Sequence, residues 1–125
     1  MPRVVLEAVH LDQLREHGGL PGVRDENALE AALARPRQEW NYSQDVDLAT
    51  LAAAYAFGLT KAHAFADGNK RISFLAAMIF LGLNGKELDA SESEVVQVMI
   101  ALAEGTMKEP QLARWLRPRI VRLVL

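Results

Sequence analysis

Residues 67–85 read DGNKRISFLAAMIFLGLNG, and the apolar run inside this stretch decides the fold. The run from Ile72 to Leu83 is shorter than the roughly 18 apolar residues that a membrane-spanning helix needs. A helix that is apolar almost all round lies instead in the interior of a protein, with neighbours on every side. Asn84 and Gly85 follow as a signal for the end of a helix. We therefore predict a central apolar helix from Asn69 to Leu83.

Helical patterns also precede this stretch. Apolar spacing, capping residues and helix-favouring composition predict three helices, over residues 4–17, 26–35 and 47–63. A GGLPG turn at 18–22 separates the first two helices, because glycine opens positive φ and proline fixes its own. Pro36 is the expected stop of the second helix, and a loop is expected over 36–46.

Two capping signals follow the central helix. Ser91 with Glu94 forms an S-x-x-E capping box for a fifth helix, which is expected to end at residue 105. Thr106 with Glu109 repeats this pattern for a sixth helix to about residue 116.

The remaining segments carry little β pattern. The tail RIVRLVL, residues 119–125, either extends the bundle or forms a short strand, and at most a minor hairpin is expected near 86–88. No repeat or linker divides the chain, so we expect one domain over residues 1–125. The expected fold class is therefore all-α, a compact bundle of about six helices around the central apolar helix.

The composition excludes several classes of protein. The chain has 14 basic and 16 acidic residues and a formal net charge of −2, so nothing attracts it generally to nucleic acid or to an anionic membrane. It has no cysteine, which excludes disulfides and thiolate metal sites. The N-terminal residues lack the apolar stretch of a signal peptide. We expect a cytoplasmic protein that binds neither nucleic acid nor membranes directly.

The segment HAFADGNKR, residues 63–71, gathers chemical groups between two predicted helices. A loop of Gly68, Asn69 and Lys70 leads into the central helix. The first turn of a helix has unpaired N–H groups that can bind a phosphate. Lys70 and Arg71 add positive charge at this point.

Two further residues of this segment suit the transfer of a phosphate-containing group. The carboxylate of Asp67 suits a divalent cation whose other ligands are phosphates and water. The imidazole of His63 suits a general base that takes a proton from an attacking hydroxyl. A base, a metal ligand and an anion site together describe phosphoryl or nucleotidyl transfer.

Each of these residues also has an ordinary structural role. A histidine ends many helices, an aspartate begins many, and a Lys-Arg pair is often a solvated face, so a non-catalytic helical binding module stays an alternative. The segment is neither a P-loop nor an H-E-x-x-H zinc site. Elsewhere, His10 and His17 are expected at the surface or in caps, and Trp40 and Tyr42 either line the site or pack on the bundle.

Residues 63–71 match every fixed position of H-x-F-x-[DE]-[GA]-N-[GK]-R, so the chain resembles the Fic/Doc family. With GGLPG at 18–22 and the NG pair at 84–85, nearly the whole chain is similar to the Doc (death-on-curing) toxin branch of that family. The resemblance implies a Fic fold that binds ATP with Mg²⁺. It also implies that His63 is the base, that Asp67 coordinates the metal, and that Asn69 and Arg71 bind phosphates.

The residue at position 70 distinguishes two branches of the family that the chain resembles, which transfer different groups. Glycine there accompanies AMP transfer, whereas lysine accompanies transfer of the γ-phosphate to a threonine of elongation factor Tu, which halts translation. Lys70 therefore favours kinase chemistry, because a long cationic side chain fills the space that glycine leaves open. Gly68 is closer to the Fic pattern, so a Fic-type adenylyltransferase remains the alternative.

The resemblance also bears on regulation. Many Fic proteins carry an inhibitory [ST]-x-x-x-E-[GN] helix, but Gly22 and Ile100 stand where this chain would need Ser or Thr before Glu26 and Glu104. The resemblance then implies restraint by a separate antitoxin protein. The apolar residues of the tail either contribute to its docking surface or pack against the core: Val121, Leu123, Val124 and Leu125.

Overall fold

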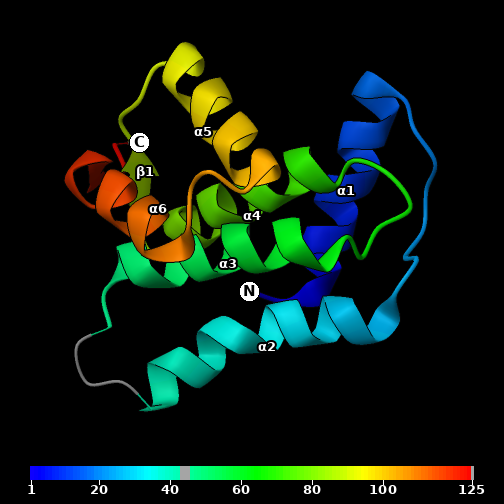
Figure 1. The fold of residues 1–125 in the computed structure, drawn as a ribbon, viewed down its shortest axis with the longest axis horizontal. Coiled ribbons are helices and arrows are strands. Elements are labelled where there is room, and N and C mark those ends of the chain that lie inside the picture. Colours follow the sequence, from blue (N-terminus) through cyan, green and yellow to red (C-terminus); the bar gives the residue numbers. More distant parts are fainter. Residues whose placement is uncertain (43–45, 125) are drawn as a thin grey trace.

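A computed structural model of the chain describes residues 1–42 and 46–124, with the side chains of Asn41 and Tyr42 left out (Figure 1). Its helices are α1 (Arg3–His17), α2 (Glu26–Tyr42), α3 (Leu48–Ala62), α4 (Asn69–Leu83), α5 (Glu92–Glu104) and α6 (Glu109–Leu116). A single 3₁₀ turn (Arg117–Arg119) and two short strands, β1 (Lys86–Leu88) and β2 (Ile120–Arg122), complete the described elements. The predicted all-α fold class with six helices is therefore confirmed.

Helices α3 and α4 pack side by side in the middle of the molecule (Figure 1). Ten of the 15 residues of α3 are buried, compared with six of the 15 residues of α4. The small alanine side chains of α3 allow this, because they let α2, α4 and α6 approach it closely. The predicted central helix thus shares the interior with α3, and its last residue, Leu83, is 62% exposed.

The buried side chains form two clusters. One lies between α3, α4, α5 and α6, and its largest member is Phe74. The other lies between α1, α2, α3 and α4, and it includes Phe65 from the segment that joins α3 to α4 and Ile72 from the first turn of α4. This second cluster anchors the joining segment, since Phe65 is only 1% exposed.

The predicted end of α2 at Pro36 is wrong, because the helix continues to Tyr42. Pro36 has no N–H for the carbonyl of Ala32, and this normally destabilises a helix interior by about 3 kcal/mol. Pro36 is itself buried, however, and it borders an apolar hollow together with Trp40, Leu51 and Tyr55. Packing between α2 and α3 therefore outweighs the lost hydrogen bond, and the loop expected over 36–46 is helical as far as residue 42.

The C-terminal segment forms a strand, which settles the two alternatives for the tail. β2 pairs antiparallel with β1, with Leu88 opposite Ile120 and Lys86 opposite Arg122. The feature expected near 86–88 is therefore a pairing between segments distant in sequence and not a local hairpin. Val124 beyond it is 81% exposed, and the position of Leu125 lies outside the described residues.

The capping predictions for the last two helices had different outcomes. Ser91 and Glu94 form the expected capping box at the start of α5. The box expected from Thr106 is wrong, because α6 begins after Lys108, whose backbone N–H donates to Gln111 Oε1 at 2.7 Å. The Thr106 hydroxyl instead donates to the carbonyl of Ala101, which closes the turn after α5. In the described part of the chain, no helix has the length and apolar character required to cross a membrane.

Candidate functional site

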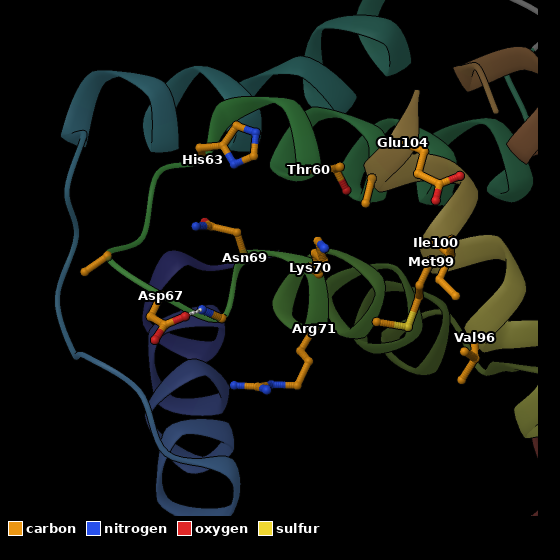
Figure 2. A pocket seen from close by; sticks show the side chains of 13 residues that line it. Thr60, His63, Asp67, Asn69, Lys70, Arg71, Val96, Met99, Ile100 and Glu104 are labelled. Atoms are coloured by element: carbon orange, nitrogen blue, oxygen red, sulfur yellow. Dashed lines mark hydrogen bonds between the residues drawn. The ribbon is translucent and has the colours of Figure 1, made fainter. Parts of the chain in front are cut away.

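The segment HAFADGNKR borders a hollow of about 870 Å³ (Figure 2). Its lining includes all six residues that the sequence singled out: His63, Asp67, Gly68, Asn69, Lys70 and Arg71. The rest of the lining comes from Ala66, from Thr60 of α3 and from five residues of α5: Val96, Met99, Ile100, Ala103 and Glu104. The hollow therefore has a polar side formed by the loop before α4 and a largely apolar wall formed by α5.

Backbone hydrogen bonds attach this loop to residues 22–25, which precede α2. The carbonyl of Ala64 accepts from the N–H groups of Arg24 at 2.7 Å and Asp25 at 3.0 Å. The N–H of Ala66 donates to the carbonyl of Gly22 at 3.0 Å, so that Val23 and Phe65 form an isolated antiparallel bridge. The GGLPG turn thus leads directly into a segment that holds the loop.

His63 ends α3 in a left-handed conformation, with φ 46° and ψ 42°, and its side chain is exposed at the hollow (Figure 2). Left-handed backbone costs an ordinary residue roughly 1–2 kcal/mol, so something must support it. Arg24 provides such support, since its Nη2 donates to the His63 carbonyl at 2.6 Å. The imidazole is therefore available to a ligand while the backbone behind it is fixed.

Asp67 presents its carboxylate on the other side of Asn69 from His63 (Figure 2). Its Oδ1 accepts from the N–H of Gly68 at 2.8 Å, whereas Oδ2 has no hydrogen-bond partner among the described residues. Oδ2 lies so close to Gly19 that a Cβ there would stand 2.8 Å from it. The Gly68 N–H thus holds one oxygen of the carboxylate, and the absence of a side chain at Gly19 leaves room for the other.

The side chain of Asn69 makes two hydrogen bonds within the loop. Its Oδ1 accepts from the N–H of Phe65 at 3.0 Å, and its Nδ2 donates to the carbonyl of Phe65 at 2.9 Å. These two bonds bring the start of α4 back onto the loop. Asn69 consequently has a structural role that the sequence did not reveal, in addition to its place in the lining of the hollow.

The N-terminus of α4 is open to an anion. Its N-cap is Gly68, at φ 75°, which has no side chain to accept hydrogen bonds from the first helical turn. Lys70 is exposed, and Arg71 is partly buried with an Nε that finds no hydrogen-bond partner in the described residues. Unpaired donors and two positive charges at a helix N-terminus are the features that bind phosphate groups.

The described residues contain no cluster of three His, Cys, Asp or Glu side chains arranged to hold a metal. Asp67 therefore offers a single carboxylate. One carboxylate is still compatible with Mg²⁺, which commonly keeps several waters and takes its other ligands from substrate phosphates.

Several residues near the site differ from the expectations or were missed. The surface position expected for His10 is wrong, since it is 3% exposed and its Nε2 lies 2.7 Å from the Asp67 carbonyl oxygen. Leu6, His10 and Leu14 are four residues apart, so their common buried face was detectable in the sequence. Trp40 borders a different hollow, together with residues of α3 and α4. The expected Tyr42 contact lies outside the described side chains.

Comparison with known proteins adds three findings. The sequence model of the Fic/DOC family matches residues 2–81. The chain is 31% identical over 112 residues to "Protein kinase doc" of Escherichia phage P1, covering 90% of this chain and 88% of that protein. It is 45% identical over 75 residues to "Toxin Doc" of Mycolicibacterium smegmatis, covering 58% of this chain and 57% of that protein.

Proposed function

The chain belongs to the Fic/DOC family, and on that premise we propose that it is a toxin that transfers the γ-phosphoryl group of ATP to a Ser or Thr hydroxyl of a protein. The single observation that carries the proposal is that His63, Asp67, Lys70 and Arg71 all line one hollow at the N-terminus of α4. The relative from phage P1 is named a protein kinase, which supports phosphoryl transfer. The proposed target is elongation factor Tu, so that the reaction would stop protein synthesis.

His63 is the proposed general base. Its exposed imidazole takes the proton of the target hydroxyl as that oxygen forms a bond to the γ-phosphorus. The bond between the γ-phosphorus and the bridging oxygen breaks in the same step, and ADP leaves. The support of the His63 backbone by Arg24 serves this role, because a base must stay within hydrogen-bond reach of the hydroxyl.

The proposed phosphate site consists of the first turn of α4 with Lys70 and Arg71. The unpaired Arg71 Nε supports this assignment, because a buried guanidinium N–H normally has an acceptor and a phosphate oxygen would supply one. Asn69 is assigned mainly to holding the loop, with its remaining amide hydrogen directed to phosphate as a further part of the proposal.

Asp67 is the residue proposed to hold Mg²⁺. Its Oδ2 accepts no hydrogen bond from the residues that the structure describes, and an oxygen ligand of this kind fits the hard cation. When bound, Mg²⁺ would offset the negative charge of the phosphate oxygens during transfer.

Two residues bear on the choice between kinase and AMP transfer. Lys70 lies beside the helix N-terminus, where its charge suits a terminal phosphate better than an esterified one. Gly68 has φ 75°, and a Cβ there would stand 3.4 Å from His10 Nε2, so glycine suits this backbone whichever way the nucleotide lies. Gly68 therefore gives AMP transfer no specific support, and we favour kinase chemistry.

A cognate antitoxin is the proposed partner, as the toxin name of the Mycolicibacterium relative suggests. Val121 and Val124 are 38% and 81% exposed, which leaves these tail residues available for such a partner.

The test uses purified protein, elongation factor Tu and ATP labelled at either the γ- or the α-phosphate. Kinase activity transfers only the γ-label, AMP transfer only the α-label, and a binding module transfers neither. We expect γ-label on the target, abolished by His63→Ala and kept by the control His17→Ala, which changes an exposed histidine outside the lining of the hollow. Absence of transfer by the wild-type protein to elongation factor Tu and to any protein of a cell extract would refute the enzymatic proposal.

A further inference from the structure

The buried histidine of α1 makes two contacts with the loop before α4. The His10 ring stacks on Phe65, with ring centroids 4.0 Å apart and an interplanar angle of 26°. Its Nε2 lies 2.7 Å from the carbonyl oxygen of Asp67. A carbonyl oxygen only accepts hydrogen bonds, so Nε2 carries a proton and donates it to this bond.

This hydrogen bond fixes the direction of one particular peptide group. In a trans peptide the C=O and N–H point in opposite directions, so holding the Asp67 carbonyl also aims the N–H of Gly68. That N–H donates to Asp67 Oδ1 at 2.8 Å. His10 is therefore connected, through one rigid peptide plane, to the carboxylate proposed to hold Mg²⁺.

The same peptide needs an external support. Gly68 has no Cβ and adopts φ 75°, so its backbone rotates with little steric resistance. The other described hydrogen bonds of the loop hold the His63 carbonyl, the backbone of residues 64–66 and the Gly68 carbonyl, and none of them reaches the Asp67 carbonyl. His10 is the described side chain that does.

A purely apolar role would not require a histidine at this position. Leu6 and Leu14, one turn before and one turn after it on the same face, are 0% and 8% exposed. A third leucine would fill this face without the cost of burying a polar ring. The hydrogen bond to the loop offsets that cost.

We propose that His10 is a positioning residue of the transfer reaction, which holds the Asp67–Gly68 peptide so that the Asp67 carboxylate faces its ligand. The catalytic part of this inference rests on the proposed function, whereas the loop-holding part does not. His10→Phe is the decisive variant, because it keeps an aromatic ring against Phe65 and removes only the donor. His10→Gln replaces the ring by an amide whose Nε2 can still donate, and His17→Phe is the matched control on an exposed position of α1.

Three measurements test the proposal. Nitrogen-15 NMR of the wild-type protein at pH 8 should show His10 protonated at Nε2, and a ring protonated only at Nδ1 would overturn the assignment. Hydrogen–deuterium exchange should be about tenfold faster over residues 64–70 in His10→Phe, while His10→Gln and His17→Phe match the wild type. Equal exchange in His10→Phe and the wild type, or equal acceleration in His10→Phe and His10→Gln, contradicts the proposal.

The kinetic measurement addresses positioning itself. We expect kcat/KM for ATP to fall about tenfold in His10→Phe, with a raised Mg²⁺ requirement, and to be restored in His10→Gln. A purely structural role would lower only the melting temperature, and it would leave kcat/KM and the Mg²⁺ requirement of the folded fraction unchanged. If the wild-type protein transfers no phosphate, the proposed function has failed, and the NMR and exchange results still decide whether His10 holds the loop.

Discussion

Replacing Gly19 by alanine tests whether the turn before α2 orients the carboxylate of the site. Gly19 has φ 123°, and a Cβ added there would stand 2.8 Å from Asp67 Oδ2 and 2.9 Å from Leu14 Cδ2. Both distances are well below ordinary van der Waals contact, so one of these side chains must move. Gly18 is the matched control, because it also has a positive φ, of 78°, but an added Cβ there has no neighbour within 4 Å.

The two variants share one cost and differ in another. Positive φ destabilises alanine by roughly 1–3 kcal/mol at either position. In Gly19→Ala the displaced carboxylate also loses its bond from the Gly68 N–H, which is worth about 1 kcal/mol because Asp67 is exposed. We therefore expect the free energy of unfolding to fall by about 1 kcal/mol more in Gly19→Ala than in Gly18→Ala.

Urea unfolding measures the stability difference, and a Mg²⁺ titration of transfer activity measures the effect on the site. Gly19→Ala should require more Mg²⁺ for half-maximal activity, whereas Gly18→Ala should keep the wild-type requirement. If the two variants have the same stability and the same Mg²⁺ requirement, Gly19 does not orient Asp67 and this reasoning is wrong.

Three further predictions concern other residues. Asn69→Ala removes both bonds to Phe65 and should lower the free energy of unfolding in urea by about 1–3 kcal/mol, and no loss would contradict its structural role. Glu104→Gln removes a negative charge from the wall of the hollow, so the KM for ATP should fall about twofold in steady-state assays, and an unchanged KM would mean that this carboxylate does not face the nucleotide. Arg117, with the Thr50 N–H, holds the pKa of Asp47 well below its usual range, so this carboxylate stabilises the fold at neutral pH and the contribution is lost as the pH falls below about 3.9. Asp47→Asn should therefore cost about 1 kcal/mol by urea unfolding at pH 7 and clearly less at pH 3, and a pH-independent difference would exclude the ionic contribution.

The sequence predicted those parts of the fold that local chemistry determines. Ser91 with Glu94, and Asp47 with Thr50, form caps whose partners lie three residues away, so both helix starts were visible without tertiary information. Pro36 shows the limit of such reasoning. A proline at this place predicts the end of a helix, but buried contacts between α2 and α3 stabilise the helix beyond it. These contacts join residues far apart in the sequence, so they were not visible in it.

The site divides in the same way. The nine-residue segment 63–71 located the hollow, because its groups are neighbours in the chain as well as in space. His10 and Arg24 were not found, because their contacts with the loop join residues 57 and 39 positions apart. The burial of His10 could be predicted, because its spacing from Leu6 and Leu14 places it on the same buried face. The spacing does not show which group its ring contacts.

The structure separates the residues that would perform the chemistry from those that would select a partner. Every described hydrogen bond that holds the backbone of residues 63–68 comes from α1, from residues 22–25 or from within residues 63–72, all inside the region that matches the family. The opposite wall comes from α5, beyond that region, and its Val96 and Ile100 are 52% and 51% exposed. Exposed aliphatic residues beside a polar site contribute little to phosphate binding, but they offer apolar contact to a bound protein. A change in this wall would therefore alter which protein is recognised more readily than which group is transferred.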